Sequence, residues 1–304
     1  MKEIYGIIIK GVGGRYEILA DDAIDVVQNR IICRAKGIFR KDEIAPLPGD
    51  RVLVEIQADG EGLITAIEPR KNEFVRPKVS NVDRVYIVTS VRKPKPDLAY
   101  IDRLTVICDI KQVDCRLIFN KIDLKDADEY TALYQAAGFI VHAVSALEKQ
   151  NLEAVMVELP GTLSCFAGFS GVGKSELLSA LFGKRMAVSA DVSEKLGRGR
   201  HTTRTVELFP LEGVDDLTLI GDTPGFNVVE LLRYEKLEWD ELAEHFREFA
   251  PLLGKCKYGG CTHVKEDGCA IIEAVQAGTI ATSRHESYLK MFEEIKDYRT
   301  WQDK

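Results

Sequence analysis

Short apolar runs separated by glycine and proline dominate the first 70 residues of this 304-residue chain. The runs are rich in β-branched side chains and lie at residues 4–9, 16–19, 26–34 and 51–56. Short strands at this spacing are typical of a small barrel, and the OB-fold, which often binds oligonucleotides, is the natural candidate. We therefore predict about five strands forming an OB-fold barrel over residues 1–70.

A basic segment of this predicted barrel, residues 30–41, is a candidate RNA contact. Its cationic and aromatic side chains are Arg30, Arg34, Lys36, Phe39, Arg40 and Lys41. Basic residues around an aromatic ring can follow a phosphate backbone and stack on bases. A solvated strand face would have the same composition, so the segment leaves both interpretations open.

Beyond a linker predicted at 69–73, the pattern changes to alternating strands and helices. Strands are predicted at 82–89, 115–119, 139–144, 163–167, 205–211 and 217–221. Helices are predicted at 98–110, 126–137, 151–158 and 176–182. Such alternation indicates a mostly parallel sheet covered on both faces.

From about residue 230 the hydrophobic pattern becomes helical, with helices expected near 235–250, near 271–277 and from residue 285 onward. The fold class is thus multi-domain. We predict the barrel at 1–70, an α/β phosphate-loop domain at 71–230 and a mostly helical domain at 231–304.

The composition is that of an ordinary soluble protein, with 45% hydrophobic and 29% charged residues. We expect a cytoplasmic protein without a membrane partner, because no apolar run approaches the ~18–20 residues of a membrane span and no signal peptide is evident. We also expect a monomer. The net charge of −7 argues against nucleic-acid binding through bulk attraction, while leaving room for local basic patches. In a reducing compartment, the seven cysteines should be thiols or metal ligands.

Residues 168–175, Gly-Phe-Ser-Gly-Val-Gly-Lys-Ser, carry the strongest chemical signal in the chain. They fit G-x-x-x-x-G-K-[S/T], in which backbone N–H groups surround phosphates, the lysine reaches the β and γ oxygens and the serine binds Mg²⁺. The predicted strand before the motif and the helix after it place a positive helix end against the anion. The chain is therefore expected to bind a nucleoside phosphate.

A base-recognition motif, N-K-x-D, directly follows the strand predicted at 115–119 and consists of Asn120, Lys121, Ile122 and Asp123. A carboxylate at Asp123 can accept hydrogen bonds from guanine N1–H and N2–H₂, and adenine lacks both donors. Lys121 can lay its alkyl stem on the base, and Asn120 can tie this loop to the phosphate loop. By itself the motif is weak evidence for guanine binding, but at the end of a strand beside a phosphate loop it is strong evidence.

Two further motifs complete a guanine-nucleotide set. Ser145 and Ala146 end the next strand and fit a second base loop, in which a backbone N–H faces guanine O6. Asp222 and Gly225 fit D-x-x-G, where the aspartate acts through Mg²⁺ and the glycine N–H meets the γ-phosphate. The phosphate loop usually comes first, whereas here the base motifs precede it. Such a circular permutation preserves the site if the original termini lay close together.

The segment 197–204 lies between the phosphate loop and D-x-x-G and contains two glycines and three arginines. It is expected to be mobile and basic, a hairpin loop with solvated arginines being the alternative. Either Thr202 or Thr203 should ligate Mg²⁺, and the sequence leaves open which. Phe226 stands where many GTPases place a water-orienting glutamine, so unassisted hydrolysis should be slow. His201 is the candidate catalytic substitute, although a lone loop histidine is usually just solvated.

A metal-binding pattern follows in the C-terminal region, C-x₄-C-x-H-x₅-C, formed by Cys256, Cys261, His263 and Cys269. Three thiolates and one imidazole suit tetrahedral Zn²⁺, and four protein ligands leave no open position for catalysis. Unrelated buried thiols are the alternative. We predict one structural Zn²⁺.

With these motifs in this order, the chain resembles the circularly permuted ribosome small-subunit-dependent GTPase A family from end to end. The resemblance implies an OB-fold, a permuted GTPase domain and a zinc domain that act on the 30S ribosomal subunit and its rRNA late in subunit maturation. It also implies that the subunit stimulates hydrolysis of GTP to GDP, and that hydrolysis accompanies release. Glu176 departs from the small residue expected there, which should not affect phosphate binding.

The predicted nucleotide and Mg²⁺ contacts are Asn120, Lys121, Ile122, Asp123, Ser145, Ala146, Gly168, Phe169, Ser170, Gly171, Val172, Gly173, Lys174, Ser175, Glu176, Thr202, Thr203, Asp222 and Gly225. Two other functions compete with a GTPase switch. A phosphate loop also occurs in small-molecule phosphotransferases, although the base motif and the threonine segment speak against one. A non-hydrolysing RNA-binding module that uses nucleotide as a scaffold would bind GTP without turnover.

Overall fold

The computed structural model describes residues 2–21, 30–37, 39, 44–183, 206–211, 216–222 and 237–297. The chain divides into two compact units. The first contains Met1–Tyr86, Leu152–Ala167 and Lys174–Asn227, and the second contains Ile87–Asn151, Gly168–Gly173 and Val228–Lys304. The α/β part predicted from the sequence therefore contributes to both units.

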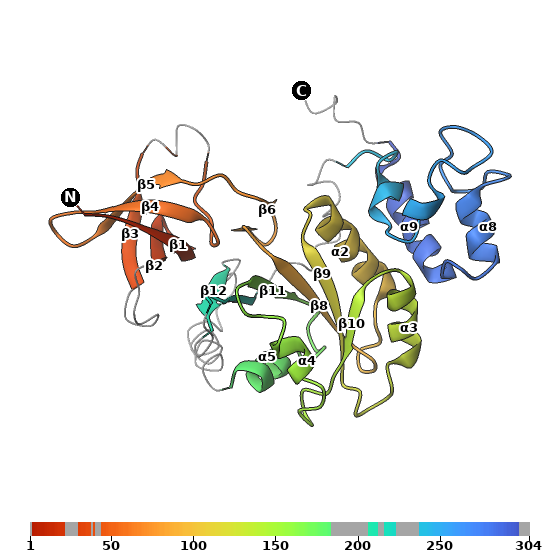
Figure 1. Cartoon of the computed structure of the whole chain (residues 1–304), viewed down its shortest axis with the longest axis horizontal. Coiled ribbons are helices and arrows are strands. Elements are labelled where there is room, and N and C mark those ends of the chain that lie inside the picture. Colours follow the sequence, from red (N-terminus) through yellow and green to blue (C-terminus); the bar gives the residue numbers. More distant parts are fainter. Residues whose placement is uncertain are drawn as a thin grey trace. The chain divides into compact units, whose positions relative to one another are not determined.

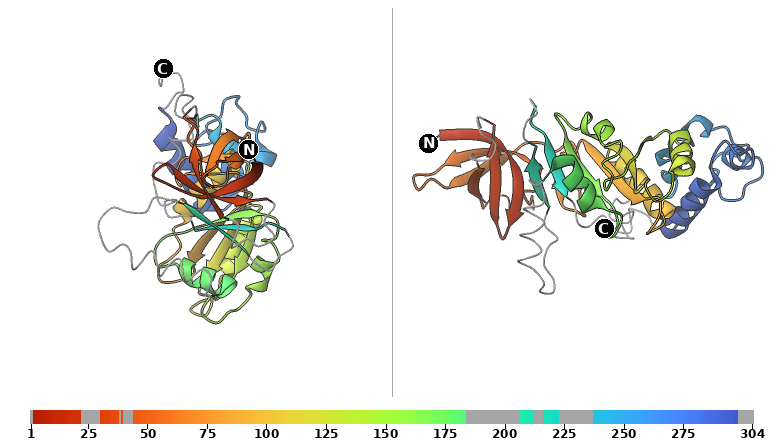
Figure 2. Two further views of the ribbon diagram at one scale, coloured as in Figure 1. Left: turned by 90° about the vertical axis from the view of Figure 1, so that its left-hand side faces the viewer. Right: turned by 90° about the horizontal axis from the view of Figure 1, so that it is seen from below.

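Five N-terminal strands form a closed barrel in the first unit (Figures 1 and 2). They are β1 (Lys2–Val12), β2 (Arg15–Ala20), β3 (Arg30–Ala35), β4 (Arg51–Ile56) and β5 (Gly62–Ile67). Pairing runs from β1 through β2, β3, β5 and β4, and β4 returns to β1. Only the β3–β5 pair is parallel among these. This closure confirms the predicted barrel.

Alternating side chains fill the barrel, because successive residues of a strand point to opposite faces. The buried core consists of Ile8, Ile18, Cys33, Val52, Val54 and Ile64. In the basic segment, Arg30 pairs with Glu17 at 3.4 Å and Arg34 pairs with Glu61 at 3.0 Å. Phe39 packs against the core, while Arg40 and Lys41 lie outside the described residues.

The buried carboxylate of Asp50 connects the barrel to the segment that follows it. Its oxygens accept hydrogen bonds from Arg70 Nε at 2.7 Å, Ser80 Oγ at 2.6 Å and the Leu47 N–H at 2.8 Å. Ser80 belongs to a short antiparallel pair, β6 (Glu73–Phe74) and β7 (Val79–Ser80), that the sequence pattern did not predict. Four hydrogen bonds from three residues, two of them from the Arg70 guanidinium, compensate the fully buried charge of Asp50.

The α/β elements agree with the predicted ones to within a few residues. The strands are β8 (Arg84–Ser90), β9 (Asp114–Asn120), β10 (Ile140–Ala143), β11 (Leu163–Ala167), β12 (Glu207–Pro210) and β13 (Leu219–Asp222). The helices are α2 (Leu98–Ile110), α3 (Asp128–Ala136), α4 (Glu153–Met156) and α5 (Lys174–Phe182).

In the second unit, β9 and β10 are parallel, with α2 against β9 and α3 against β10 (Figure 1). In the first unit, β11 and β13 are parallel, and β12 runs antiparallel to β13. Phe166 lies opposite Asp222 in this register. The carboxyl ends of β11 and β13 therefore meet at one sheet edge, where α/β proteins bind ligands.

The C-terminal region contains the helices α8 (Ala270–Gln276) and α9 (Thr282–Ile295), as expected from the sequence. The α-helix expected near 235–250 is wrong for the described residues 237–250, where the helical segments are 3₁₀ turns at Leu242–His245 and Ala250–Leu252. The chain leaves helical geometry at Phe246 (φ −103°, ψ 102°), whose ring stacks on Phe249 at 4.9 Å and meets Tyr288 edge-on at 5.5 Å. Packing of these rings overrides local helix propensity. Within the described part of the chain, no helix is long and apolar enough to cross a membrane.

A buried ion cluster joins α2 to α9 within the second unit. Arg284, with 1% of its side chain exposed, donates to Asp102 at 2.7 Å and to Glu248 at 2.6 Å. Asp102 also accepts from the Tyr134 hydroxyl at 2.8 Å. The guanidinium lies over the rings of Tyr134, Phe139 and Phe246. The C-terminal helices are thus connected to the α/β core by charge as well as by apolar contact.

Candidate functional site

The phosphate loop begins where the fully buried strand β11 ends, and α5 follows it. Gly168 passes so close to β8 that a Cβ there would lie 2.4 Å from the Val88 carbonyl oxygen. Gly173 has a φ of +88°, in the left-handed region that favours glycine. These two positions explain why the loop requires its first and last glycines.

Asn120 is the central residue of the candidate base site, at the end of β9 and fully buried. Its Nδ2 donates to the Val172 carbonyl of the phosphate loop at 3.1 Å, and its Oδ1 accepts from the Ala146 N–H at 3.0 Å. One side chain therefore links the phosphate loop to both base loops. The sequence predicted its contact with the phosphate loop, and the structure adds the contact with Ala146.

Lys121 and Asp123 complete the base loop. The Lys121 ammonium donates to the Gly171 carbonyl at 2.6 Å and to the Lys93 carbonyl at 2.9 Å. Asp123 is exposed, and its Oδ1 accepts from Ser145 Oγ at 2.6 Å. The serine holds one carboxylate oxygen, and the remaining acceptor positions face solvent, where a base can approach.

In the first unit, the Lys174 ammonium lies 2.5 Å from Asp222 Oδ1, which unites the lysine of the phosphate loop with the aspartate of D-x-x-G. Ser175 and Glu176 are exposed in the first turn of α5. The predicted residues His201, Thr202, Thr203 and Gly225 lie outside the described part of the chain, as does Phe226.

The loop between β8 and α2, residues 91–97, also contacts the phosphate loop, which the motifs did not indicate. Pro94 lies 3.8 Å from the position of a Cβ on Gly171. The ring of Tyr100, in the first turn of α2, lies 4.0 Å from the ring of Phe169. A basic Arg-Lys-Pro-Lys-Pro run at the carboxyl end of a predicted strand was the available signal, since ligand sites gather at such ends.

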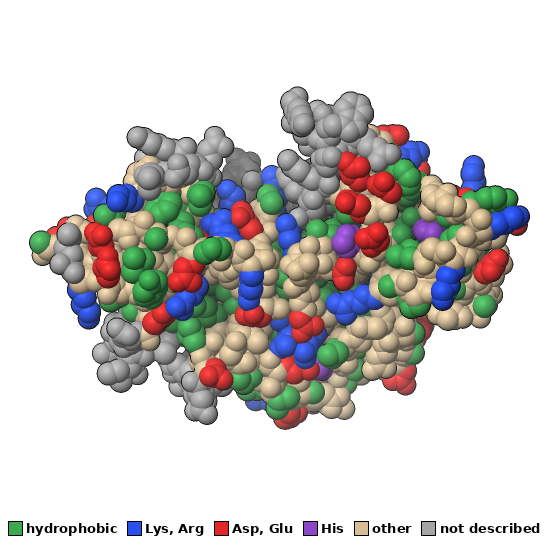
Figure 3. Space-filling model, turned by 45° about the horizontal axis from the view of Figure 1, so that its top comes forward, with side chains coloured by type: hydrophobic (Ala, Val, Ile, Leu, Met, Phe, Trp, Pro, Cys, Tyr) green, Lys and Arg blue, Asp and Glu red, His purple; other side chains and the backbone are tan. Residues whose placement is uncertain are grey.

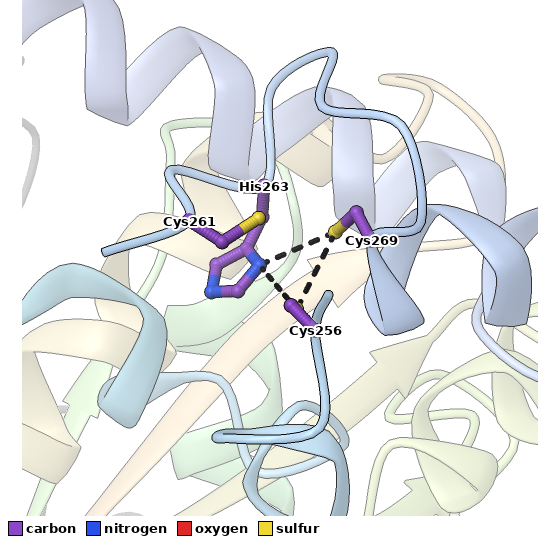
Figure 4. A group of neighbouring side chains, drawn as sticks. All are labelled: Cys256, Cys261, His263 and Cys269. Atoms are coloured by element: carbon purple, nitrogen blue, oxygen red, sulfur yellow. Dashed lines mark hydrogen bonds between the residues drawn. The ribbon is translucent and has the colours of Figure 1, made fainter. Parts of the chain in front are cut away.

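The Cys/His cluster forms as predicted, and its four ligand atoms lie within 4.8 Å of one another (Figure 4). The His263 Nδ1 atom lies 3.6 Å from Cys256 Sγ and 3.3 Å from Cys269 Sγ, and these two sulfurs are 3.9 Å apart. Burial lowers the pKa of His263, which favours the neutral imidazole that binds metals. The cluster can therefore hold a metal ion.

Surrounding hydrogen bonds fix the loop that carries these ligands. The carbonyls of Thr262 and His263 accept from the Tyr288 hydroxyl and from His285 Nε2, both at 2.8 Å. Although burial opposes it, hydrogen bonds from the Thr262 hydroxyl and several backbone N–H groups lower the pKa of Glu266 to about 2. Glu266 therefore stays ionised at neutral pH and closes the loop over residues 262–266.

Comparison with known proteins places these features in one family. A family model described as RsgA GTPase matches residues 67–232, and one described as RsgA N-terminal domain matches residues 5–64. The Small ribosomal subunit biogenesis GTPase RsgA of Caldanaerobacter subterraneus subsp. tengcongensis is 38% identical over 300 residues, covering 98% of this chain and 97% of the relative. The protein of the same name from Geobacillus thermodenitrificans is 39% identical over 298 residues, covering 96% and 97%.

Solved structures agree with this assignment. YjeQ from Thermotoga maritima has a TM-score of 0.77 and 29% identity, covering 98% of this chain and all of its own. YloQ, described as a circularly permuted GTPase, has a TM-score of 0.77 and 31% identity, covering 97% and 96%. The fold class and the resemblance inferred from the motif order are confirmed. The chain belongs to the RsgA GTPase family and is a GTP hydrolase.

Proposed function

We propose that this chain acts as a cytoplasmic monomer on the 30S ribosomal subunit late in its maturation, and that hydrolysis of GTP to GDP and phosphate accompanies its release. The relatives that match it over nearly their whole length are named small ribosomal subunit biogenesis GTPases. The observation that carries nucleotide binding is the buried Asn120, which ties the phosphate loop to both base loops. A phosphate loop in an unrelated kinase would not need this connection.

In the proposed site, different residues of the chain contact the base, the phosphates and the Mg²⁺ ion of GTP. Asp123 accepts hydrogen bonds from the guanine N–H groups, while the Ser145 hydroxyl donates to its Oδ1 atom. Backbone N–H groups of the phosphate loop and Lys174 hold the β- and γ-phosphates. Ser175, Asp222 and one of Thr202 and Thr203 would hold Mg²⁺, which neutralises charge that develops on the phosphates. The hydrolytic water needs a further orienting group, for which His201 is the candidate.

The test of this function is the rate of GTP hydrolysis with and without purified 30S subunits. Phe226 cannot orient water, so the isolated chain should release phosphate slowly and 30S subunits should accelerate it. The products should be GDP and inorganic phosphate without any added acceptor, whereas a kinase would need a second substrate. Equal rates with and without 30S subunits, or equal stimulation by 50S subunits, would contradict the proposal.

Replacing His201 by alanine should lower the 30S-stimulated rate at least about 10²-fold, because a water-positioning or general-base group contributes on that scale. GTP affinity and 30S binding should stay unchanged, which separates loss of chemistry from loss of binding. The measurement is single-turnover phosphate release on saturating 30S subunits. A wild-type rate in His201→Ala would reduce His201 to a loop residue, and the hydrolytic group would have to come from elsewhere.

For the Cys/His cluster, we propose one structural Zn²⁺. Tetrahedral zinc with bonds of ~2.3 Å to sulfur and ~2.0 Å to nitrogen separates two sulfurs by about 3.8 Å and a sulfur from the nitrogen by about 3.5 Å. The spacings of 3.9, 3.6 and 3.3 Å in the cluster fit these values. Burial raises the pKa of the Cys261 thiol to about 12, and a bound cation would favour the thiolate instead.

The purified chain should therefore contain about one zinc per molecule, measured by elemental analysis. Cys261→Ala removes one of four ligands and should lose the metal during dialysis against a chelator that leaves the wild type loaded. Tyr258→Ala is the matched control, because this exposed residue lies between two ligands without being one. Freshly purified wild type without metal, or Cys261→Ala with wild-type metal retention, would overturn the zinc site.

A further inference from the structure

The loop between β8 and α2, residues 91–97, is held in one conformation by its neighbours. Ser90 Oγ donates to the Pro94 carbonyl at 2.7 Å, and the Val91 N–H donates to the Asn120 carbonyl at 3.0 Å. At its far end, Asp97 caps α2 by accepting from the Tyr100 N–H at 3.1 Å. Pro94 and Pro96 each restrict the backbone further. A ligand that binds this loop therefore pays little conformational entropy to order it.

The side chains that this loop presents are cationic and exposed. Arg92, Lys93 and Lys95 are exposed, and none of the three pairs with a carboxylate of the described residues. Several other cations of the α/β part are paired with carboxylates, as Arg103 is with Glu294 at 2.6 Å. The nearest acid in sequence, Asp97, is engaged in the helix cap.

This cationic loop belongs to a chain with a net charge of −7. On the face drawn in Figure 3, acidic and basic side chains are interspersed over short distances. Three exposed cations within four residues, held on a rigid loop, match the repeating charge of a nucleic-acid backbone better than they match isolated counter-ions.

The loop also touches the phosphate loop. The Lys121 ammonium bridges the carbonyls of Lys93 and Gly171 at 2.9 and 2.6 Å. Pro94 lies in van der Waals range of the Gly171 position. A partner bound to Arg92 and Lys95 would consequently lie next to the residues that hold the nucleotide phosphates.

We propose that Arg92, Lys93 and Lys95 form a docking surface for the phosphate backbone of RNA beside the nucleotide site. The inference rests on the proposed action on the 30S subunit and specifies which side of the α/β part meets its RNA. Phosphate contacts position a protein without reading sequence. The surface therefore contributes to affinity and orientation, while base-specific contacts, where present, belong to other parts of the chain.

The test is the salt dependence of binding to 30S subunits by the double variant Arg92→Gln/Lys95→Gln. Each phosphate contact contributes about 0.7–0.9 to the slope of log affinity against log salt. Loss of two contacts should therefore make that slope shallower by roughly 1.4–1.8 and weaken binding at low salt. Lys93 stays unchanged, because its backbone accepts the hydrogen bond from Lys121 beside the phosphate loop. GTP affinity and unstimulated hydrolysis should equal those of the wild type.

The matched control is Lys2→Gln/Lys290→Gln, which removes the same charge from two exposed positions elsewhere and should keep the wild-type slope. If the wild type binds 30S subunits and the loop variant has the same salt slope as the control variant, the docking-surface proposal is wrong and the proposed function stands. If the wild type neither binds nor responds to 30S subunits, the proposed function fails. The same slope change should appear with protein-free 16S rRNA. A change with subunits alone would assign the loop to an acidic protein surface and overturn the RNA proposal.

Discussion

Replacing Asp123 by asparagine will weaken GTP binding roughly 10²–10⁴-fold and will favour xanthosine triphosphate in its place. In the proposed site the carboxylate would accept hydrogen bonds from two guanine donors, and each charge-assisted hydrogen bond contributes about 1.5–3 kcal/mol. Xanthine carries a carbonyl where guanine has its amino group, so the asparagine N–H₂ can donate to it. Ser145 Oγ already holds Asp123 at 2.6 Å and should orient the asparagine in the same way.

Nucleotide affinities measured by equilibrium titration of both triphosphates test this exchange. Asp126→Asn is the matched control, since it removes an exposed carboxylate from the same loop and should leave base preference intact. Unchanged GTP affinity in Asp123→Asn would remove Asp123 from the site. Equal loss of both triphosphates would indicate a folding defect rather than a base contact.

Arg284→Ala will destabilise the second unit by about 3–5 kcal/mol, because removing one partner of a buried ion cluster leaves uncompensated charge. Asp102 and Glu248 would then be buried without the cation that lies 2.7 and 2.6 Å away. Urea denaturation followed by Trp239 fluorescence measures the effect, since the Trp239 ring packs edge-on against Phe292 of α9 at 5.9 Å.

Two comparisons separate this cluster from ordinary ion pairs. Arg103→Ala breaks the more exposed pair with Glu294 on the same helices and should lower the free energy of unfolding by about 1 kcal/mol or less.

Burial raises the pKa of Asp102, against the attraction of Arg284. An acid with a raised folded-state pKa destabilises the fold increasingly as pH rises above its unfolded value. The loss in free energy of unfolding caused by Arg284→Ala should therefore be smaller at low pH. An equal loss in Arg284→Ala and Arg103→Ala, or a loss in Arg284→Ala that does not change with pH, would contradict the assignment.

Local pattern was sufficient for most elements of the α/β part. The helix predicted at 98–110 and the strand predicted at 163–167 have the bounds of α2 and β11. Their signals are short-range, because helical spacing and β-branched runs need no distant partner. The helix expected near 235–250 failed for the opposite reason, since the Phe246 and Phe249 rings pack against the distant Tyr288 of α9 and these contacts decide the backbone there.

The sequence by itself determined the chemistry of the candidate site: a phosphate loop, guanine motifs in permuted order and four metal ligands at close spacing. Each is a short motif, and the types of its residues determine which ligand atoms it can bind. Only the tertiary structure decided what surrounds these motifs. It placed the basic loop at 91–97 against Gly171 and buried Arg284 between Asp102 and Glu248. Charged residues are normally exposed. No local pattern therefore identifies the few charged residues that become buried in ion pairs with residues far away in the sequence.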